Sequence, residues 1–133
     1  MIEKEKKAYT DLDVWKEART LANDIYTSSK LFPREELFGL TSQMRRCAVS
    51  IASNIAEGCG RNYPKDSIQF FFIARGSLYE LETQIYIAFD QSYLTEDLHQ
   101  SLLKKVEITR KLLSGFINYY QKLSKSVSKS VNT

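Results

Sequence analysis

The segment from residue 40 to residue 61 constrains the fold most, because it combines a helical repeat with many small side chains. Apolar residues recur at steps of three and four, as on one face of a helix: Leu40, Met44, Cys47, Ala48, Ile51 and Ile55. Small residues fill most other positions, namely Ser50, Ala52, Ser53, Ala56 and Gly58. Other helices can approach such a helix closely from several sides, so it predicts the middle of a helical bundle or a subunit contact.

Three further segments predict helices. The first opens at Thr10, with Asp13 completing a capping box, and ends near Lys30, before Phe32-Pro33. Another runs from Pro64, capped by the nearby Asn62, to Ser92, with a core face of Phe70, Phe71, Ala74, Leu78, Leu81, Ile85 and Phe89. The last starts at Thr95 with a hydroxyl cap, and its apolar residues recur about every 3.5 positions.

The connections between these helices are short. Residues 33–36 predict a single turn, and Gly58 and Gly60 are expected to end the second helix in a left-handed conformation. The 133 residues contain only five glycines and two prolines, which disfavours a β fold with many turns. We therefore predict an all-α protein, an antiparallel up-down-up-down four-helix bundle, forming a single domain over residues 1–133, with residues 1–9 and 124–133 frayed.

The chain contains no apolar run long enough to span a membrane. The first seven residues, Met-Ile-Glu-Lys-Glu-Lys-Lys, have no apolar stretch and predict no secretory signal. The expected location is the cytoplasm, with no membrane partner.

Catalytic and metal-binding patterns are weak. Glu96 and His99 match the Glu-x-x-His motif of di-iron bundles, but the motif occurs once and the chain has one histidine. Cys47 and Cys59 lack metal-ligand spacing. The loop from Gly58 to Arg61 lacks the spacing of a phosphate-binding loop. The sequence therefore predicts no enzyme, no cofactor and no metal.

Polar residues form strips along the second and third predicted helices. Arg46, Ser50, Ser53 and Glu57 recur along one side of the second; on the third, one strip holds Arg75, Tyr79, Glu82 and Tyr86, and another holds Ser77, Glu80 and Gln84. Buried charges are costly unless they are paired, and arginine pairs with carboxylates in a bidentate way. We favour ion pairs within or between subunits over a ligand site for these strips.

Several bulky side chains exceed what one bundle core can cover. Phe70, Phe71, Phe72 and Ile73 are consecutive, so they spread around most of the helix, and Tyr79 and Tyr86 lie off the core stripe. We interpret these six residues as the interface of a homo-oligomer.

Charge is unevenly distributed, although the net charge is only +3. Residues 95–133 carry seven basic and three acidic residues, with no acidic residue after Glu107. Such a distribution indicates either a phosphate-binding surface or a solvated helix end. The candidate nucleic-acid-binding residues are Arg45, Arg61, Lys65, Lys104, Lys105, Arg110 and Lys111.

Four motifs in order resemble one family. They are Asp11-Leu-x-Val-Trp15, Gly39-Leu-Thr-Ser-Gln-x-Arg-Arg46, Ser50-Ile-x-Ser-Asn-Ile-Ala-Glu-Gly58 and Ala74-Arg-Gly-Ser-Leu-x-Glu-Leu-Glu-Thr83. The chain resembles, over about residues 9–121, the four-helix-bundle proteins encoded in intervening sequences of bacterial 23S rRNA genes, also labelled ribosomal proteins. A more distant resemblance is to the accessory protein of diversity-generating retroelements.

The resemblance implies a bacterial, cytoplasmic bundle that forms a ring-like homo-oligomer, a pentamer, with a suspected role in nucleic-acid binding. The family's motifs fall on polar residues of the strips, namely Arg46, Asn54, Glu57, Arg75, Glu80 and Glu82. Our hypothesis is a non-enzymatic oligomer that binds structured RNA or DNA through phosphate contacts. The alternative is a scaffold or adaptor that recruits another protein and binds no nucleic acid.

Overall fold

The computed structural model describes residues 8–132, with side chains through Val127, and this part of the chain contains four α-helices. They are α1 (Asp13–Ser29), α2 (Leu40–Cys59), α3 (Pro64–Asp90) and α4 (Glu96–Asn132). Two short 3-10 turns, Tyr9–Asp11 and Arg34–Glu36, precede α1 and α2. The predicted all-α class and the turn after Pro33 are confirmed. No helix among these residues combines the length and hydropathy that a bilayer crossing requires.

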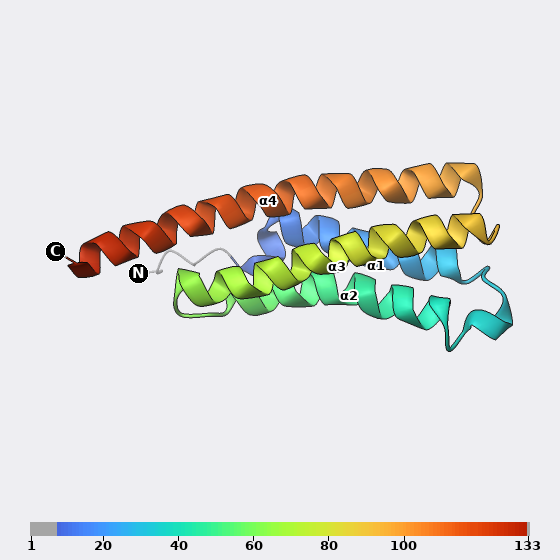
Figure 1. The fold of residues 1–133 in the computed structure, drawn as a ribbon, viewed down its shortest axis with the longest axis horizontal. Coiled ribbons are helices and arrows are strands. Elements are labelled where there is room, and N and C mark those ends of the chain that lie inside the picture. The colour runs from blue at the N-terminus through green and yellow to red at the C-terminus, as the bar shows by residue number, and fades with distance from the viewer. Residues whose placement is uncertain (1–7, 133) are drawn as a thin grey trace, which may run out of the picture.

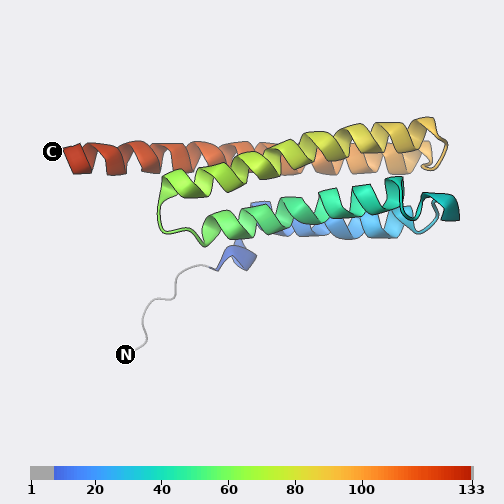
Figure 2. The ribbon, with the colours of Figure 1, turned by 60° about the horizontal axis from the view of Figure 1, so that its bottom comes forward.

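Consecutive helices are antiparallel neighbours, and α4 returns to pack against α1, so the bundle closes (Figure 1). The α2–α3 connection and the last turns of α4 lie at one end of the molecule. The α1–α2 and α3–α4 connections lie at the other end. The C-terminal part of α4, the longest helix at 37 residues, extends beyond the α2–α3 connection (Figure 2). The predicted up-down-up-down bundle is therefore confirmed.

Every helix contributes buried apolar side chains to one core. The largest that are fully buried include Leu21 and Ile25 of α1, Met44, Ile51 and Ile55 of α2, Phe71, Leu78, Leu81 and Ile85 of α3, and Leu102, Val106 and Leu113 of α4. These residues recur at helical spacing, so the periodicity correctly predicted the inward face of each helix.

The glycines at the end of α2 act differently from the prediction. No glycine in residues 8–132 has a positive φ, and Gly60 has φ −84°. Gly58 instead allows a close approach, since a Cβ on it would lie 2.4 Å from Cε1 of Phe71. The prediction of left-handed glycines was wrong because packing between α2 and α3 sets the requirement here.

Two predicted N-caps are also wrong. The capping box of Thr10 and Asp13 does not form, because α1 starts after Leu12, which makes no side-chain cap. Leu12 packs against the core, and the Tyr9 ring lies edge-on to Trp15 with centroids 5.4 Å apart. These contacts hold the preceding residues in a separate turn. Tyr63, not Asn62, precedes α3.

The turn from α3 to α4 follows a Schellman pattern without glycine. Ser92 has φ 64°, its N–H donates to the carbonyl of Phe89, and the N–H of Tyr93 donates to that of Ala88. This turn ends α3 at Asp90, two residues before the predicted Ser92. The cap of α4 is confirmed, since the Thr95 hydroxyl accepts a hydrogen bond from the Leu98 N–H at 3.2 Å.

The chain end also differs from the prediction. Residues 124–132, which we expected to fray, continue α4 to Asn132. Extending an existing helix adds a hydrogen bond for each residue that is ordered, and this segment contains neither glycine nor proline. Residues 1–7 and 133, for which fraying was also predicted, lie outside the described residues.

Candidate interaction surfaces

Two of the predicted phosphate-binding arginines are held against neighbouring side chains. Arg45 of α2 donates from Nε to the Ser29 hydroxyl at 2.9 Å, and its guanidinium carbon lies 4.8 Å from the Tyr26 ring centroid. The guanidinium of Arg61 lies 4.3 Å from the Phe70 ring centroid and 3.8 Å from the Glu57 carboxylate. Arg45 precedes Arg61 by 16 residues, about 24 Å along a helix, so the two do not form one surface.

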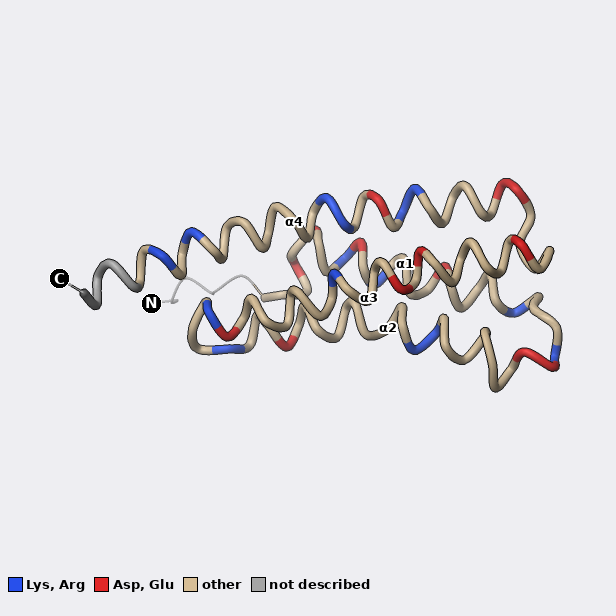
Figure 3. Tube along the Cα trace, in the orientation of Figure 1, with Lys and Arg blue, Asp and Glu red and all other residues tan. Residues whose placement is uncertain are grey.

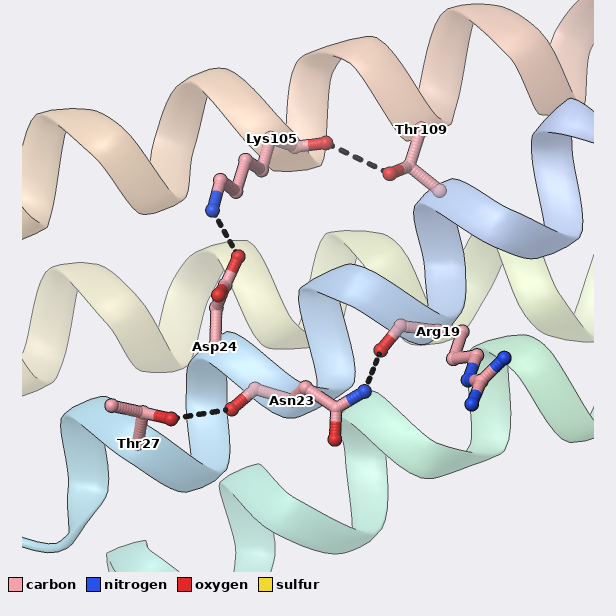
Figure 4. A network of polar contacts seen from close by, with 6 residues as sticks. All are labelled: Arg19, Asn23, Asp24, Thr27, Lys105 and Thr109. Atoms are coloured by element: carbon pink, nitrogen blue, oxygen red, sulfur yellow. Dashed lines mark hydrogen bonds and ion pairs between the residues drawn. The ribbon is translucent and has the colours of Figure 1, made fainter.

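Three of the four predicted basic residues on α4 form ion pairs. Lys105 pairs with Asp24 of α1 (Figure 4), and Arg110 pairs with Glu82 of α3 at 3.2 Å. Lys111 pairs with Glu107 of the same helix at 3.1 Å. Lys104 has no ion pair with any described residue. Lys105 and Arg110 therefore join α4 to its two neighbours, a structural role that the charge pattern did not predict.

Basic segments lie in the α2–α3 connection and on the last turns of α4, at the same end of the bundle, and acidic segments flank the connection (Figure 3). A groove of about 310 Å³ lies between these segments, lined by Tyr63, Pro64, Lys65 and Asp66 on one side and by Ser124 and Val127 on the other. Lys122 and Lys125 are exposed on the adjoining turns of α4. We call Arg61, Lys65, Lys122 and Lys125 the basic end. Arg61 and Lys65 are among the residues that the sequence predicts to bind nucleic acid, and the pairing of helices adds Lys122 and Lys125.

The predicted polar network does not form within the chain. Arg46, Glu57 and Glu80 are exposed, and the guanidinium of Arg75 lies over the Phe72 ring of its own helix at 4.9 Å. The Asn54 amide donates to the Ser50 carbonyl at 2.8 Å. Of the six residues, only Glu82 forms an ion pair with another helix within the described part of the chain, and its partner is Arg110. Pairing of these residues between subunits stays a prediction.

Neutral groups supply the polar contacts between α2 and α3. The Ser50 hydroxyl lies 2.8 Å from the Ser77 hydroxyl, and the Cys47 thiol donates to the Ser77 carbonyl at 3.1 Å. Burial, together with the nearby carboxylate of Glu80, raises the pKa of the Cys47 thiol to about 12. Cys47 is therefore an unreactive part of the packing.

The predicted oligomer interface divides into buried and exposed parts. Phe71 is fully buried, with its ring 5.0 Å from that of Phe116, so its assignment to an interface was wrong. Phe70 and Phe72 are half-buried, whereas Ile73 is 54% exposed and Tyr79 and Tyr86 are also exposed. Ile73 and Tyr79 point about 120° apart around α3, since residues advance about 100° each. The exposed apolar residues of α3 therefore lie on two faces.

His99 is buried, and its ring stacks on Phe89 with centroids 4.1 Å apart. Its Nδ1 has no hydrogen-bond partner among the described residues. No group of three or more potential metal-ligating side chains occurs in the described part of the chain. His99 thus serves as a packing residue at the start of α4.

A second groove, of about 470 Å³, runs between α1 and α2. The α1 side of the groove is mostly aromatic and polar, and the α2 side is mostly small. The lining residues are Tyr9, Trp15, Arg19, Ala22, Asn23 and Tyr26 on the α1 side and Val49, Ala52, Ser53 and Ala56 on the α2 side. The guanidinium of Arg19 lies 5.5 Å from the Trp15 ring centroid. The small residues of α2 are evident in the sequence, but residue spacing within one helix does not pair them with the aromatic residues of α1.

Comparison with known families identifies the chain. The family described as "23S rRNA-intervening sequence protein" matches residues 10–115. The chain belongs to this family. Among solved structures, a protein of unknown function from the S23 ribosomal protein family of Bacteroides thetaiotaomicron is similar, with 24% identity and a TM-score of 0.73 over 79% of this chain and 95% of the other. A search of curated proteins found no match. The match to the 23S rRNA-intervening sequence proteins confirms the family resemblance, and the solved structure supports the fold.

Proposed function

We propose that this protein is a non-enzymatic, cytoplasmic helical bundle that forms a homo-oligomer and binds structured RNA or DNA through phosphate contacts. The family's link to an rRNA intervening sequence motivates the choice of nucleic acid as the partner. The observation that carries the proposal is the basic end, where the start of α3, with Lys65, adjoins the turns of α4 that carry Lys122 and Lys125.

The composition of the basic end suits a phosphate backbone. Lys65, Lys122 and Lys125 form no ion pair with any described residue, so their charges are available to a ligand. α4 carries no acidic residue after Glu107. Lysine and arginine that neutralise phosphates release condensed counterions, which drives binding in a salt-dependent way.

Exposed tyrosines lie at the same end of the bundle. Tyr63 is 64% exposed beside Lys65, and Tyr119 is 58% exposed near Gly60. Aromatic rings beside basic residues are typical of proteins that bind loops and single strands, because unpaired bases stack on them. A hairpin with an unpaired loop is therefore the preferred ligand class.

The test is a salt titration of binding to a labelled RNA hairpin and to duplex DNA. Each phosphate neutralised on B-form DNA contributes about −0.9 to the slope of log affinity against log salt. Changing Lys65, Lys122 and Lys125 together to glutamine removes three contacts, so the slope should flatten by roughly 2.7.

The matched control changes three exposed lysines elsewhere, Lys16, Lys30 and Lys104, to glutamine. This variant has the same net charge as the first, and it should keep most of the slope. Equal flattening in both variants, or no salt dependence in the unchanged protein, would contradict the proposal.

The oligomeric part of the proposal rests on exposed apolar residues of α3, namely Ile73, Tyr79 and Tyr86. The family resemblance suggests five subunits. Light scattering at micromolar concentration should therefore give a mass well above the 15.4 kDa of one chain. A monomer would refute this part and leave the salt titration unaffected.

The alternative, a protein scaffold, is favoured by the opposite end of the bundle. In the α1–α2 connection Leu31 is 83% exposed and Phe38 is 94% exposed. Exposed apolar side chains mark a contact with another protein when several of them form one patch, and the α1–α2 connection also exposes Leu37. Capture of a partner that survives nuclease treatment and is lost with Phe38→Ser would favour the scaffold, provided that the salt titration shows no nucleic-acid binding.

A further inference from the structure

The groove between α1 and α2 is lined by one positive charge and by no negative charge. Among its lining residues Arg19 is the one charged group, and no carboxylate lines it. Arg45 extends this character beyond the groove, since its guanidinium lies over the Tyr26 ring that lines the groove. A ligand for this surface should therefore be anionic.

Aromatic rings line the groove at two separate points, the half-buried Trp15 and the exposed Tyr26. Trp15 with Arg19 stands near one end of α1, and Tyr26 with Arg45 stands near the other. Trp15 and Tyr26 are eleven residues apart, about 16 Å along the helix, and they face nearly the same direction. The rise between stacked nucleotides is about 3.4 Å, so this distance matches a strand of a few nucleotides.

The floor of the groove leaves room for flat groups. Ala22 of α1 and Ala52, Ser53 and Ala56 of α2 carry small side chains that do not fill the space between the helices. At one edge the Asn23 amide donates to the Arg19 carbonyl at 3.0 Å (Figure 4). The side-chain oxygen of Asn23, Oδ1, can still accept a hydrogen bond from a ligand.

We propose that this groove binds a short single-stranded segment of nucleic acid, with bases stacked on Trp15 and Tyr26 and phosphates close to Arg19 and Arg45. The inference rests on the proposed function and adds a second site, which reads unpaired bases, to the phosphate-binding basic end. A second copy of the chain is the competing occupant. Two arginines, Arg19 and Arg45, lie over these aromatic rings, and no carboxylate lines the groove. Both observations favour a nucleic acid over a second copy.

Trp15 makes the test direct, because it is the single tryptophan of the chain. A short oligoadenylate should quench Trp15 fluorescence in a saturable way, whereas the same strand in a duplex should quench it far less. The free mononucleotide AMP should also quench weakly, because it contacts one ring and not two. Quenching by AMP as strong as by the oligonucleotide would overturn the strand proposal.

Variants separate stacking from general charge, with affinity measured by anisotropy of a labelled oligoadenylate. Trp15→Leu should weaken binding about 5- to 150-fold, since stacking of one base contributes roughly 1–3 kcal/mol, and Trp15→Phe should retain most of it. Arg19→Gln should also weaken binding. The matched control is Arg75→Gln, because Arg75 lies over Phe72 in the same kind of pair but outside the groove. Equal losses in Arg19→Gln and Arg75→Gln would overturn the proposal.

The two sites fail in distinguishable ways. The glutamine variant of Lys65, Lys122 and Lys125 should lose duplex and hairpin binding yet keep the quenching of Trp15 by single strands. Duplex binding without any quenching by single strands would refute the groove and leave the proposed function standing. A Trp15 emission that shifts to the blue with protein concentration alone would show that a second copy occupies the groove, which also overturns the inference.

Discussion

Helix α2 contacts α3 on one side and α1 on the other, and the two contacts differ although both use its small residues. On the α3 side, α2 and α3 pack closely: Gly58 lies against the Phe71 ring, and the hydroxyls of Ser50 and Ser77 are hydrogen-bonded. Toward α1 the small residues Ala52 and Ala56 line an open groove. A small residue thus closes a contact only where the opposite helix supplies a side chain that fills the space.

The role of a charged residue likewise depends on which side chains the adjacent helix places beside it. Lys105 and Arg110 lie beside Asp24 and Glu82, so they join helices. Lys65 of the basic end forms no ion pair with any described residue. Residues of one chemical type therefore separate into structural and exposed sets only after the helices are paired.

The largest effect should come from removing the side chain that closes the α2–α3 contact. Phe71→Ala deletes a fully buried ring and leaves a cavity, so we expect the free energy of unfolding to fall by about 3–5 kcal/mol. Urea denaturation measures this loss. The control is Phe72→Ala at the adjacent, half-buried position, where the loss should be clearly smaller. Equal losses would mean that Phe71 does not form the closed contact.

The second effect comes from adding one methyl group at the same contact. Gly58→Ala places a Cβ 2.4 Å from Cε1 of Phe71, and overpacking of this kind destabilises by about 1–3 kcal/mol. Gly76→Ala is the matched control, because its Cβ meets no atom within 4 Å and alanine favours the helix by about 0.5–1 kcal/mol. Thermal unfolding should show opposite shifts. A higher Tm for both variants would contradict the close contact.

The third effect is a pH dependence confined to the closed side of α2. The pKa of the Cys47 thiol rises from 9.0 to about 12, so the folded state keeps the proton that the unfolded chain loses. Its contribution to stability is present below pH 9 and declines as the pH rises toward 12, reaching a loss of about 1–2 kcal/mol at pH 10. Urea denaturation between pH 8 and 10 measures the slope. Cys47→Ser should flatten it, and an unchanged slope in that variant would exclude Cys47 as its source.

The smallest effect on stability is expected on the open side. Ala56→Val adds bulk toward the α1–α2 groove, so the free energy of unfolding should change by no more than about 0.5 kcal/mol. The same substitution at the fully buried Ala48 should cost about 1–3 kcal/mol. Calorimetry of the two variants compares them directly. A large loss at Ala56 would show that the groove is closed in solution.

The sequence predicted the fold well, because helical periodicity is a local property. The inward faces of all four helices, the break at Pro33 and the Thr95 cap could be read from residue spacing. The errors at Thr10 and Asn62 concern helix starts, where local capping competes with tertiary contacts. At Thr10, the packing of Tyr9 and Leu12 against other residues determined the start of α1.

The interaction surfaces were less predictable, because they depend on pairs of residues far apart in the sequence. The sequence by itself determined the helices, their apolar faces, the excess of basic residues near the end and the family motifs. Only the tertiary structure decided that Phe71 belongs to the core, that Arg110 pairs with Glu82, and that Lys65 adjoins the end of α4. Periodicity specifies the direction of a side chain on its own helix, whereas partners and exposure depend on which helix packs opposite and at what register.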